Sequence, residues 1–326
     1  MYEQSFGFRE KPFSLLPDPA FLYLSPGHRT AYALLEYGVL NQAGFTVVTG
    51  EVGCGKTTLI RHLLDQLDDE VTLGLLSNTH RRYTDLLQWV LMAFGLDYRS
   101  KGPVEVYETF VEFLIDEYAR GRRVVLVVDE AQNLDSAALE ELRTLSNINA
   151  DKHQILQLVL VGQPELQTTL ERPDLRQLAQ RVVAHYHLVP FSEEETVRYI
   201  RHRLQCAGGS PDLFTLDACR RVHRESGGVP RLINLICDTA LVYAYAEDAV
   251  RVGNELVQGV VDEHAAGMRP GTERDLPPAD AAAQWSGGEK QSDVPRSGDS
   301  RPEKRITGLD RADARQLFAH LTKKTS

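Results

Sequence analysis

The chain has 326 residues, of which 42% are hydrophobic and 25% charged, values ordinary for a globular protein long enough for more than one folded unit. Its formal net charge of −10 disfavours a general nucleic-acid-binding protein, because such proteins usually present a basic surface. The four cysteines are scattered without a Cys-x-x-Cys pair, which disfavours a zinc site or a disulfide framework and is typical of a reducing cytoplasm.

Short apolar runs rich in β-branched residues alternate with segments of helical periodicity over the first two-thirds of the chain. Runs that are apolar on both faces are typical of parallel strands covered by helices on each side. Helices are predicted between these runs, one starting after Lys56 and one capped by Asp135 or Ser136. The alternation predicts an α/β domain over residues 1–190 with right-handed crossovers. Its five predicted strands are Phe45–Thr49, Val71–Leu76, Arg123–Val128, Leu156–Gly162 and Val183–Val189.

The pattern changes after residue 190, where strand-like runs stop. A small helical domain is predicted over residues 191–265, with helices near Ser192–Gln205, Thr215–Glu225, Pro230–Ala246 and Asn254–His264. Residues 266–306 are rich in Pro, Gly, Ser and charged side chains, so we predict a disordered linker that buries too little apolar surface to fold. Residues 307–326 regain one apolar stripe, which fits either a short docking helix or a frayed tail.

The first motif with chemical meaning follows the strand at Phe45–Thr49. Residues 50–57 fit the G-x-x-x-x-G-K-[ST] pattern, in which glycines let backbone N–H groups converge on phosphate oxygens and the next helix adds its positive end. Lys56 is expected to reach the β- and γ-phosphates, and the Thr57 hydroxyl to ligate Mg²⁺. The motif predicts a site for ATP and Mg²⁺ formed by Gly50, Val52, Gly53, Cys54, Gly55, Lys56, Thr57 and Thr58.

Cys54 lies inside this glycine-rich segment, and two interpretations of it are open. A thiol near a helix N-terminus and a lysine can have a lowered pKa and be oxidisable. Alternatively, Cys54 is a small residue that the turn tolerates, and this second interpretation is favoured.

Two acidic residues follow the strand Arg123–Val128, at the strand end where α/β sheets bind ligands. Asp129 is expected to hold the Mg²⁺ shell, and Glu130 to polarise the attacking water. The alternative is that the pair merely starts the next helix. Gln163, at the end of the strand Leu156–Gly162, would orient the water or sense the γ-phosphate. These residues predict an ATPase that converts ATP and water to ADP and phosphate.

Two arginines complete the predicted catalytic set. Arg181 ends a helix just before the fifth strand, and Arg231 opens a helix of the small domain directly after Gly227-Gly228-Val229-Pro230. The competing interpretation of each is a solvated or locally ion-paired side chain. Arg176 is the alternative candidate for the role given to Arg181.

In combination these motifs resemble those of bacterial AAA+ ATPases of the general secretion pathway A (ExeA) type, a family with relatives linked to pilus and exopolysaccharide export. The resemblance covers about residues 1–265. Beside the glycine-rich segment, it rests on Phe6–Phe13, Pro17–Pro19, Phe21–Ser25, Glu36–Gly38, Asp129–Leu134, Leu160–Leu166, Leu178–Arg181 and Gly228–Asn234.

The resemblance implies an AAA+ fold with a parallel five-stranded sheet and a nucleotide in the cleft between the α/β domain and a helical lid. It implies that Gln163 is the first sensor and Arg231 the second, and that Pro12–Phe13 and the Tyr37 region lie near the base. It also implies that the sensor strand lies between the strands bearing the glycine-rich segment and Asp129.

Arg181 matches the arginine finger of this family, which acts on ATP in a neighbouring subunit. A finger supplied in trans leaves a monomer incomplete, so the resemblance implies a homo-oligomer. Fingers of this kind contribute about 10³–10⁵ in rate.

Members of the secretion type commonly continue into a membrane span and a peptidoglycan-binding domain, and this chain shows neither. No secretory signal is recognisable either. We therefore expect a cytoplasmic protein, acting there or at the periphery of the inner membrane, with an envelope-export protein as partner. The leading functional hypothesis is that ATP hydrolysis energises or assembles a secretion system. The alternatives are a DNA-binding regulator of the transposition-accessory type and a slow nucleotide switch that recruits a partner through the tail.

Overall fold

The computed structural model describes residues 2–16, 18–41, 44–66, 70–77, 86–150 and 153–267. Its centre is a five-stranded sheet with the spatial order β2-β3-β6-β1-β7, in which every neighbouring pair is parallel. The strands are β1 (Phe45–Gly50), β2 (Val71–Leu76), β3 (Arg123–Val128), β6 (Leu156–Gly162) and β7 (Val182–Leu188). The predicted strands therefore form, with β1 one residue longer and β7 shifted by one residue.

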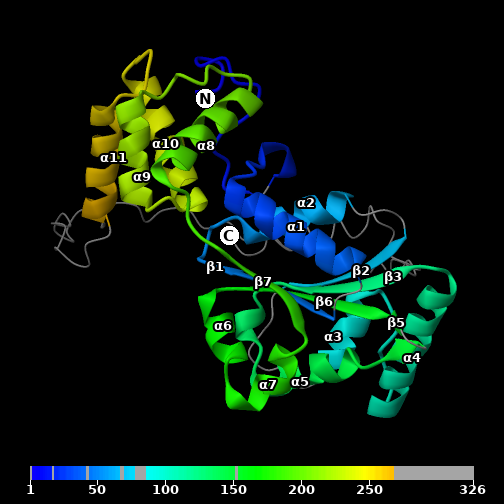
Figure 1. The fold of residues 1–326 in the computed structure, drawn as a ribbon. Coiled ribbons are helices and arrows are strands. Elements are labelled where there is room, and N and C mark those ends of the chain that lie inside the picture. Colours follow the sequence, from blue (N-terminus) through cyan, green and yellow to red (C-terminus); the bar gives the residue numbers. More distant parts are fainter. Residues whose placement is uncertain are drawn as a thin grey trace, which may run out of the picture.

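Helices cover both faces of this sheet, as Figure 1 shows. Alternate residues of each strand point to opposite faces, so β3 gives Val125 and Val127 to one helical layer and Leu126 and Val128 to the other. One layer is α1 (Pro26–Leu40) and α2 (Lys56–Gln66). The other is α3 (Leu86–Ala93), α4 (Pro103–Ala119), α5 (Ser136–Leu145), α6 (Pro164–Leu170) and α7 (Arg176–Ala179).

The strand order decides which loops meet. Because all strands are parallel, the ends of β1, β3 and β6 lie on one edge, with β6 between the other two. The loops that follow these strands carry the glycine-rich segment, the acidic pair and Gln163. The expected position of the sensor strand between its two partners is confirmed.

The lid consists of α8 (Glu193–Cys206), α9 (Leu216–Ser226), α10 (Pro230–Ala246) and α11 (Asn254–Gly267), drawn in green to orange in Figure 1. Ser192 begins α8 with a capping box, in which its hydroxyl accepts from the Glu195 N–H and the Glu195 carboxylate accepts from the Ser192 N–H. Gly227 ends α9 in the left-handed conformation that glycine adopts without steric cost. The lid has its own apolar core, separate from the two cores of the sheet.

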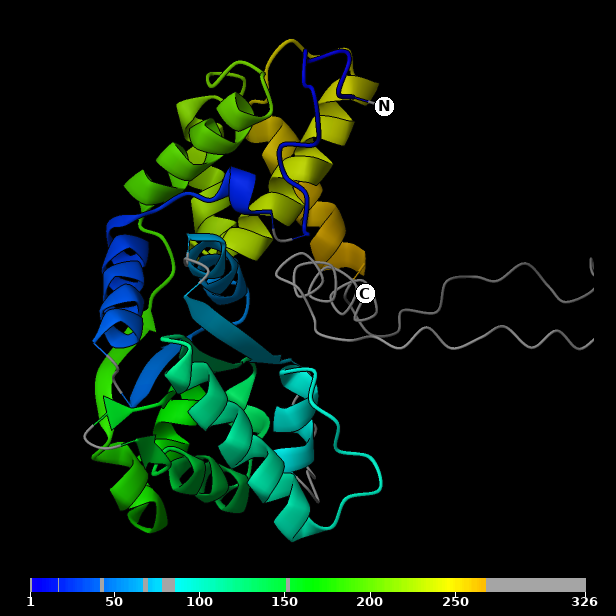
Figure 2. The ribbon, with the colours of Figure 1, turned by 90° about the vertical axis from the view of Figure 1, so that its right-hand side faces the viewer.

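The N-terminal segment packs against the lid rather than against the sheet. Four of its aromatic side chains, Tyr2, Phe8, Phe13 and Phe21, are buried in the lid core. In Figure 2 this dark blue segment runs alongside the lid helices. The predicted range 1–190 placed these residues with the α/β domain; their packing groups them with the lid, because aromatic spacing alone does not say which core a segment joins.

The remaining elements are short. They are η1 (Pro19–Phe21), η2 (Ala131–Asn133), η3 (Pro173–Leu175) and the antiparallel pair β4 (Asn149–Ala150) and β5 (His153–Gln154). The predicted linker 266–306 and helix 307–326 lie outside the described residues, except that residues 266 and 267 complete α11. Among the helices of the described ranges, none combines the length and apolarity that a bilayer crossing requires.

Candidate nucleotide-binding site

The loop between β1 and α2 is built on backbone that only glycine adopts easily. Gly53 and Gly55 have φ of +84° and +91°. A Cβ on Gly53 would also lie 2.7 Å from the Arg231 Cβ, and one on Gly50 would lie 2.6 Å from the Leu188 carbonyl oxygen. The glycines of the motif therefore provide both the sharp curl and the close packing against β7 and the lid.

Lys56 begins α2 and is only 6% exposed. Its ammonium group donates to the carbonyl oxygens of Gly50 at 2.7 Å and Glu51 at 3.0 Å. Burial lowers the pKa of Lys56, an effect opposed by the nearby Glu130 carboxylate. A buried cation whose bonds go to neutral carbonyls can exchange them for an anion such as a phosphate.

Thr57 and Asp129 meet across the site. The Thr57 hydroxyl donates to Asp129 Oδ2 at 3.0 Å, and the Glu130 N–H donates to Asp129 Oδ1 at 2.9 Å. Burial raises the pKa of Asp129, and the adjacent Glu130 raises it further. The half-buried Thr57 hydroxyl and the buried Asp129 carboxylate, side by side, are hard oxygen ligands of the kind that Mg²⁺ takes from proteins. The donor set therefore fits the predicted metal.

Glu130 is held by two glutamines. Its backbone is left-handed, with φ of +54°, a conformation rare for residues other than glycine and common at functional sites. Its Oε2 accepts from Gln132 Nε2 at 2.6 Å and from Gln163 Nε2 at 3.1 Å, and Gln132 Oε1 accepts from the Gln163 N–H at 3.0 Å. The structure thus joins Gln163 to Glu130 and adds Gln132, which sequence reasoning had not singled out as a site residue.

The two predicted arginines lie in different places. Arg231 lines the cavity over the glycine-rich loop, and its backbone N–H donates to the Gly53 carbonyl oxygen at 3.3 Å. Arg181 lies outside the cavity lining and donates from Nη1 to Ser146 Oγ at 3.0 Å. Arg176, the alternative to Arg181, is exposed on α7. The structure brings Arg231 to the site of its own chain and leaves Arg181 away from it.

The cavity at the loop has a volume of about 210 Å³ and lies between the sheet edge, the lid and the N-terminal segment. From the predicted set it is lined by Val52, Gly53, Gly55, Lys56, Thr57, Thr58, Glu130 and Arg231. Other lining residues come from the N-terminal segment, including Ser14, Leu15 and Leu16, and from the lid, including Tyr199, Arg203 and Asn234.

The residues that the resemblance places near the base, Pro12–Phe13 and the Tyr37 region, do not line the cavity. Phe13 is buried in the lid core, and Tyr37 is 53% exposed on α1; neither lines the cavity. The segment that follows Phe13 provides the apolar wall instead, since Leu15 and Leu16 line the cavity with about half of their surface exposed.

Arg203 on α8 holds this N-terminal segment in place. Its Nε donates to the Pro12 carbonyl oxygen at 2.5 Å, and its Nη2 lies 3.3 Å from that of Ser14. The guanidinium also stacks on Phe21, 4.5 Å from the ring centroid. No sequence signal distinguished Arg203 from the other arginines of the lid, because its partners are main-chain atoms nearly 200 residues away.

The structure favours the second interpretation of Cys54. Its side chain is 1% exposed, and burial raises the pKa of the thiol. A thiol with a raised pKa and little access to solvent is a poor nucleophile. Cys54 therefore acts as a small apolar group beneath the loop, packed with α1 and α2.

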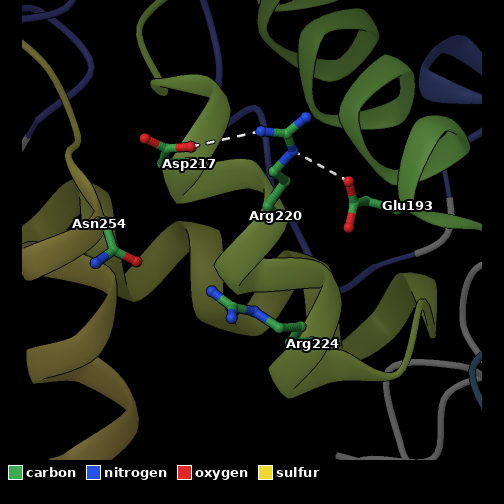
Figure 3. Close-up of a pocket in the computed structure, with 5 residues that line it drawn as sticks. All are labelled: Glu193, Asp217, Arg220, Arg224 and Asn254. Carbon is green, nitrogen blue, oxygen red and sulfur yellow. Dashed lines mark hydrogen bonds and ion pairs between the residues drawn. The ribbon is translucent and has the colours of Figure 1, made fainter.

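A larger hollow of about 350 Å³ lies on the lid surface, away from the loop (Figure 3). It is lined by Glu193, Asp217, Arg220, Arg224 and Asn254. Arg220 spans it, pairing with Glu193 at 3.1 Å and with Asp217 at 3.6 Å. Because the charges are mixed and exposed and none of the predicted site residues lies there, this hollow is not the nucleotide site.

The fold and the site together define the class of protein. A family model for an AAA domain matches residues 39–170, which include the loop, the acidic pair and Gln163. Solved structures with the same fold include the Aeropyrum pernix ORC2 protein in its ADPNP–ADP complexes and Cdc6p from Pyrobaculum aerophilum, each with a TM-score of 0.59 and 17% identity. They cover 78% and 76% of this chain, and the chain covers 72% and 71% of theirs. Residues 39–170 therefore contain an AAA domain, and the chain has a P-loop NTPase fold.

The resemblance stated from the motifs is confirmed by comparison with curated proteins. The chain is 46% identical over 253 residues to general secretion pathway protein A of Aeromonas hydrophila, a match that covers 77% of this chain and 46% of that protein. An uncharacterised HTH-type transcriptional regulator of Methanocaldococcus jannaschii is 23% identical over 176 residues, 52% of this chain and 42% of the regulator. The chain therefore spans less than half the length of either relative.

Proposed function

We propose that the chain binds ATP with Mg²⁺ in the cavity between the sheet edge and the lid, and hydrolyses it. One observation carries the proposal: the Thr57 hydroxyl lies 3.0 Å from the Asp129 carboxylate, and Thr57 lines the same cavity as the buried Lys56. A curled loop suited to phosphate binding and a strand-end acid suited to metal binding thus lie next to each other.

Each residue then has a distinct part in hydrolysis. The loop N–H groups and Lys56 bind the β- and γ-phosphates, and Thr57 and Asp129 hold Mg²⁺, which neutralises phosphate charge. Glu130 orients and polarises the attacking water, with Gln163 beside it. Arg231 approaches from the lid, so that closure of the lid brings a second cation toward the phosphates.

We further propose that Arg181 completes the site of a neighbouring copy. Support comes from its position outside the cavity of its own chain and from its match to the arginine finger of the family. The test mixes Arg181→Ala, which lacks the finger, with Lys56→Ala, which lacks phosphate binding. Each variant alone should be inactive, and the mixture should regain ATPase activity at junctions that combine an intact cavity with an intact Arg181. A mixture as inactive as its components would contradict a role in trans.

The biological role that we propose is the assembly or energising of a bacterial envelope secretion system, from the cytoplasm or the periphery of the inner membrane. Its support is the 46% identity to general secretion pathway protein A. Because this chain spans 46% of that protein, the role is carried over only for the shared ATPase portion.

The experiment that tests the enzymatic proposal is phosphate release with Mg²⁺-ATP, comparing the wild type with Lys56→Ala. We expect activity in the wild type and its loss, by at least ~100-fold, in the variant. Lys101→Ala is the matched control, since Lys101 bonds to Thr109 on α4. Substantial activity in Lys56→Ala would reject the site.

The same preparations test the alternative of a DNA-binding regulator. The net charge of −10 disfavours it. DNA retention that requires ATP and weakens steeply with salt would favour that alternative over an export role, because phosphate contacts release counterions.

A further inference from the structure

We propose that His28 on α1 is a positioning residue for ATP binding, which keeps the glycine-rich loop in its phosphate-binding shape by a hydrogen bond to the Cys54 carbonyl oxygen. This inference rests on the proposed nucleotide site. The loop lies at residues 50–57 and His28 lies 26 residues before Cys54, in a helix that no nucleotide-binding pattern includes.

The hydrogen-bonding needs of the loop explain why such a residue is required. When loop N–H groups turn inward toward phosphates, the carbonyl oxygens turn outward and need donors of their own. Lys56 supplies the carbonyls of Gly50 and Glu51, and the Arg231 N–H supplies that of Gly53. The Cys54 carbonyl is supplied by His28 Nε2 at 3.0 Å.

The two side-chain donors differ in what they do when a nucleotide arrives. The Lys56 ammonium is the proposed phosphate ligand, so its bonds to the two carbonyls compete with binding. His28 also lines the cavity, but its two ring nitrogens are bonded to the Cys54 carbonyl oxygen and the Ser25 hydroxyl and carry no charge for a phosphate. Its bond to the loop therefore does not have to break when a nucleotide binds.

The imidazole is itself fixed in orientation and tautomer. The Cys54 carbonyl only accepts, so Nε2 carries the hydrogen, and the neutral ring then presents Nδ1 as an acceptor to the Ser25 hydroxyl at 2.9 Å. His28 is 3% exposed, and the ring of Phe191 lies 5.4 Å away, between centroids. A buried ring held at both nitrogens cannot turn away from the loop without leaving polar atoms unpaired.

Glycine at position 55 makes this contact sterically possible. A Cβ on Gly55 would lie 3.1 Å from His28 Nε2, where the imidazole now approaches the loop. The second glycine of the motif thus admits the histidine as well as allowing the backbone its φ of +91°.

The test compares three substitutions by titration with a fluorescent ATP analogue and by ATPase kinetics on the full chain. In His28→Gln the amide nitrogen reaches about as far as Nε2 and can donate to Cys54, whereas in His28→Asn the amide is one methylene too short, and in His28→Leu there is no donor. We expect Gln to bind within ~3-fold of the wild type, and Asn and Leu ~10-fold more weakly, with the loss in KM rather than kcat. His62→Leu, at a partly buried histidine of α2 that contacts the Tyr32 ring, is the control.

Equal affinity of the wild type, His28→Gln and His28→Asn for the analogue would overturn the proposal. An equal loss of affinity in His28→Gln and His28→Asn would overturn it as well. If His28→Leu does not fold, the Gln and Asn pair still decides the question, because both are polar. Failure of the wild type to bind the analogue would instead overturn the proposed function. Amide hydrogen exchange gives a second readout: exchange at loop residues 51–56 should quicken in Asn and stay unchanged in the His62 control.

Discussion

The sheet edge and the lid face the same cavity but bury different chemistry. At the edge, Lys56 and Asp129 are ionisable groups whose pKa values are shifted by burial toward their neutral forms. In the lid, the buried cation Arg203 is satisfied by main-chain carbonyls and aromatic rings. The edge therefore buries groups whose charged forms are costly, and a ligand that brings phosphate and metal charge would favour those forms. The buried cation of the lid is held by contacts within the chain.

The largest effect is expected from removing the negative charge of Asp129 at the sheet edge. Asp129→Asn keeps an oxygen for the Glu130 N–H and an amide to face Thr57, but removes the buried negative charge. We expect a loss of ATPase activity of ~100-fold or more, together with a nucleotide-free protein that is as stable as the wild type or more stable by ~1 kcal/mol. Phosphate release and thermal unfolding measure the two effects. A clearly lower unfolding temperature of Asp129→Asn would contradict the expectation that the buried charge destabilises the nucleotide-free protein.

The matching change in the lid should do the opposite. Arg203→Met fills similar volume but removes the bonds that Arg203 donates to the Pro12 and Ser14 carbonyls; Ser14 keeps the bond from Asn234 Nδ2 at 3.3 Å. The N-terminal segment should therefore loosen. We expect lower stability by about 2 kcal/mol and ~10-fold weaker ATP binding, because Ser14 and its neighbours line the cavity. Unfolding by urea and nucleotide titration provide the readouts. Arg201→Met, which breaks only an exposed pair with Asp212, is the control and should change either quantity little.

A smaller effect is expected from the glutamine that links the acidic pair to β6. Gln132→Ala removes one of the two glutamine side chains that donate to Glu130. We expect kcat to fall ~3-fold to 10-fold with ATP affinity nearly unchanged, because Gln132 orients Glu130 and does not line the cavity. Single-turnover hydrolysis compared with binding separates the two. In the control Gln167→Ala, on the exposed side of α6, both should be unchanged; a loss of affinity in Gln132→Ala would contradict the orienting role.

The smallest expected effect is on pH dependence, at His28. Burial lowers the pKa of His28 below its ordinary value of 6.5, opposed by the bond to Cys54 and by the Glu195 carboxylate. Between the folded and unfolded pKa values the unfolded chain binds more protons, so stability falls as pH falls through that window. Relative to His28→Gln, the wild type should therefore lose stability as the pH falls below the ordinary histidine pKa of about 6.5. Parallel urea curves for the two proteins would contradict this.

Much of the fold was predictable because local patterns determine it. Runs apolar on both faces, such as Val124–Val128, have no stable place except between two helical layers, and all five strands formed nearly where predicted. The order of the strands is a different matter. That β6 lies between β1 and β3 came from the family resemblance and not from any residue pattern, because adjacency in a sheet is decided by crossovers and packing.

The sequence by itself determined the residues that we propose for the phosphates and the metal. They lie in two short contiguous segments, 50–58 and 129–130, whose residue types are dictated by the chemistry of the ligand. Only the tertiary structure decided what holds those segments in place, since His28, Gln132 and Arg203 act through main-chain and amide atoms far away in the chain or on the far side of a turn. The sequence position of a single polar residue does not indicate which distant atom it will contact. Its role therefore becomes visible only when packing brings the two together.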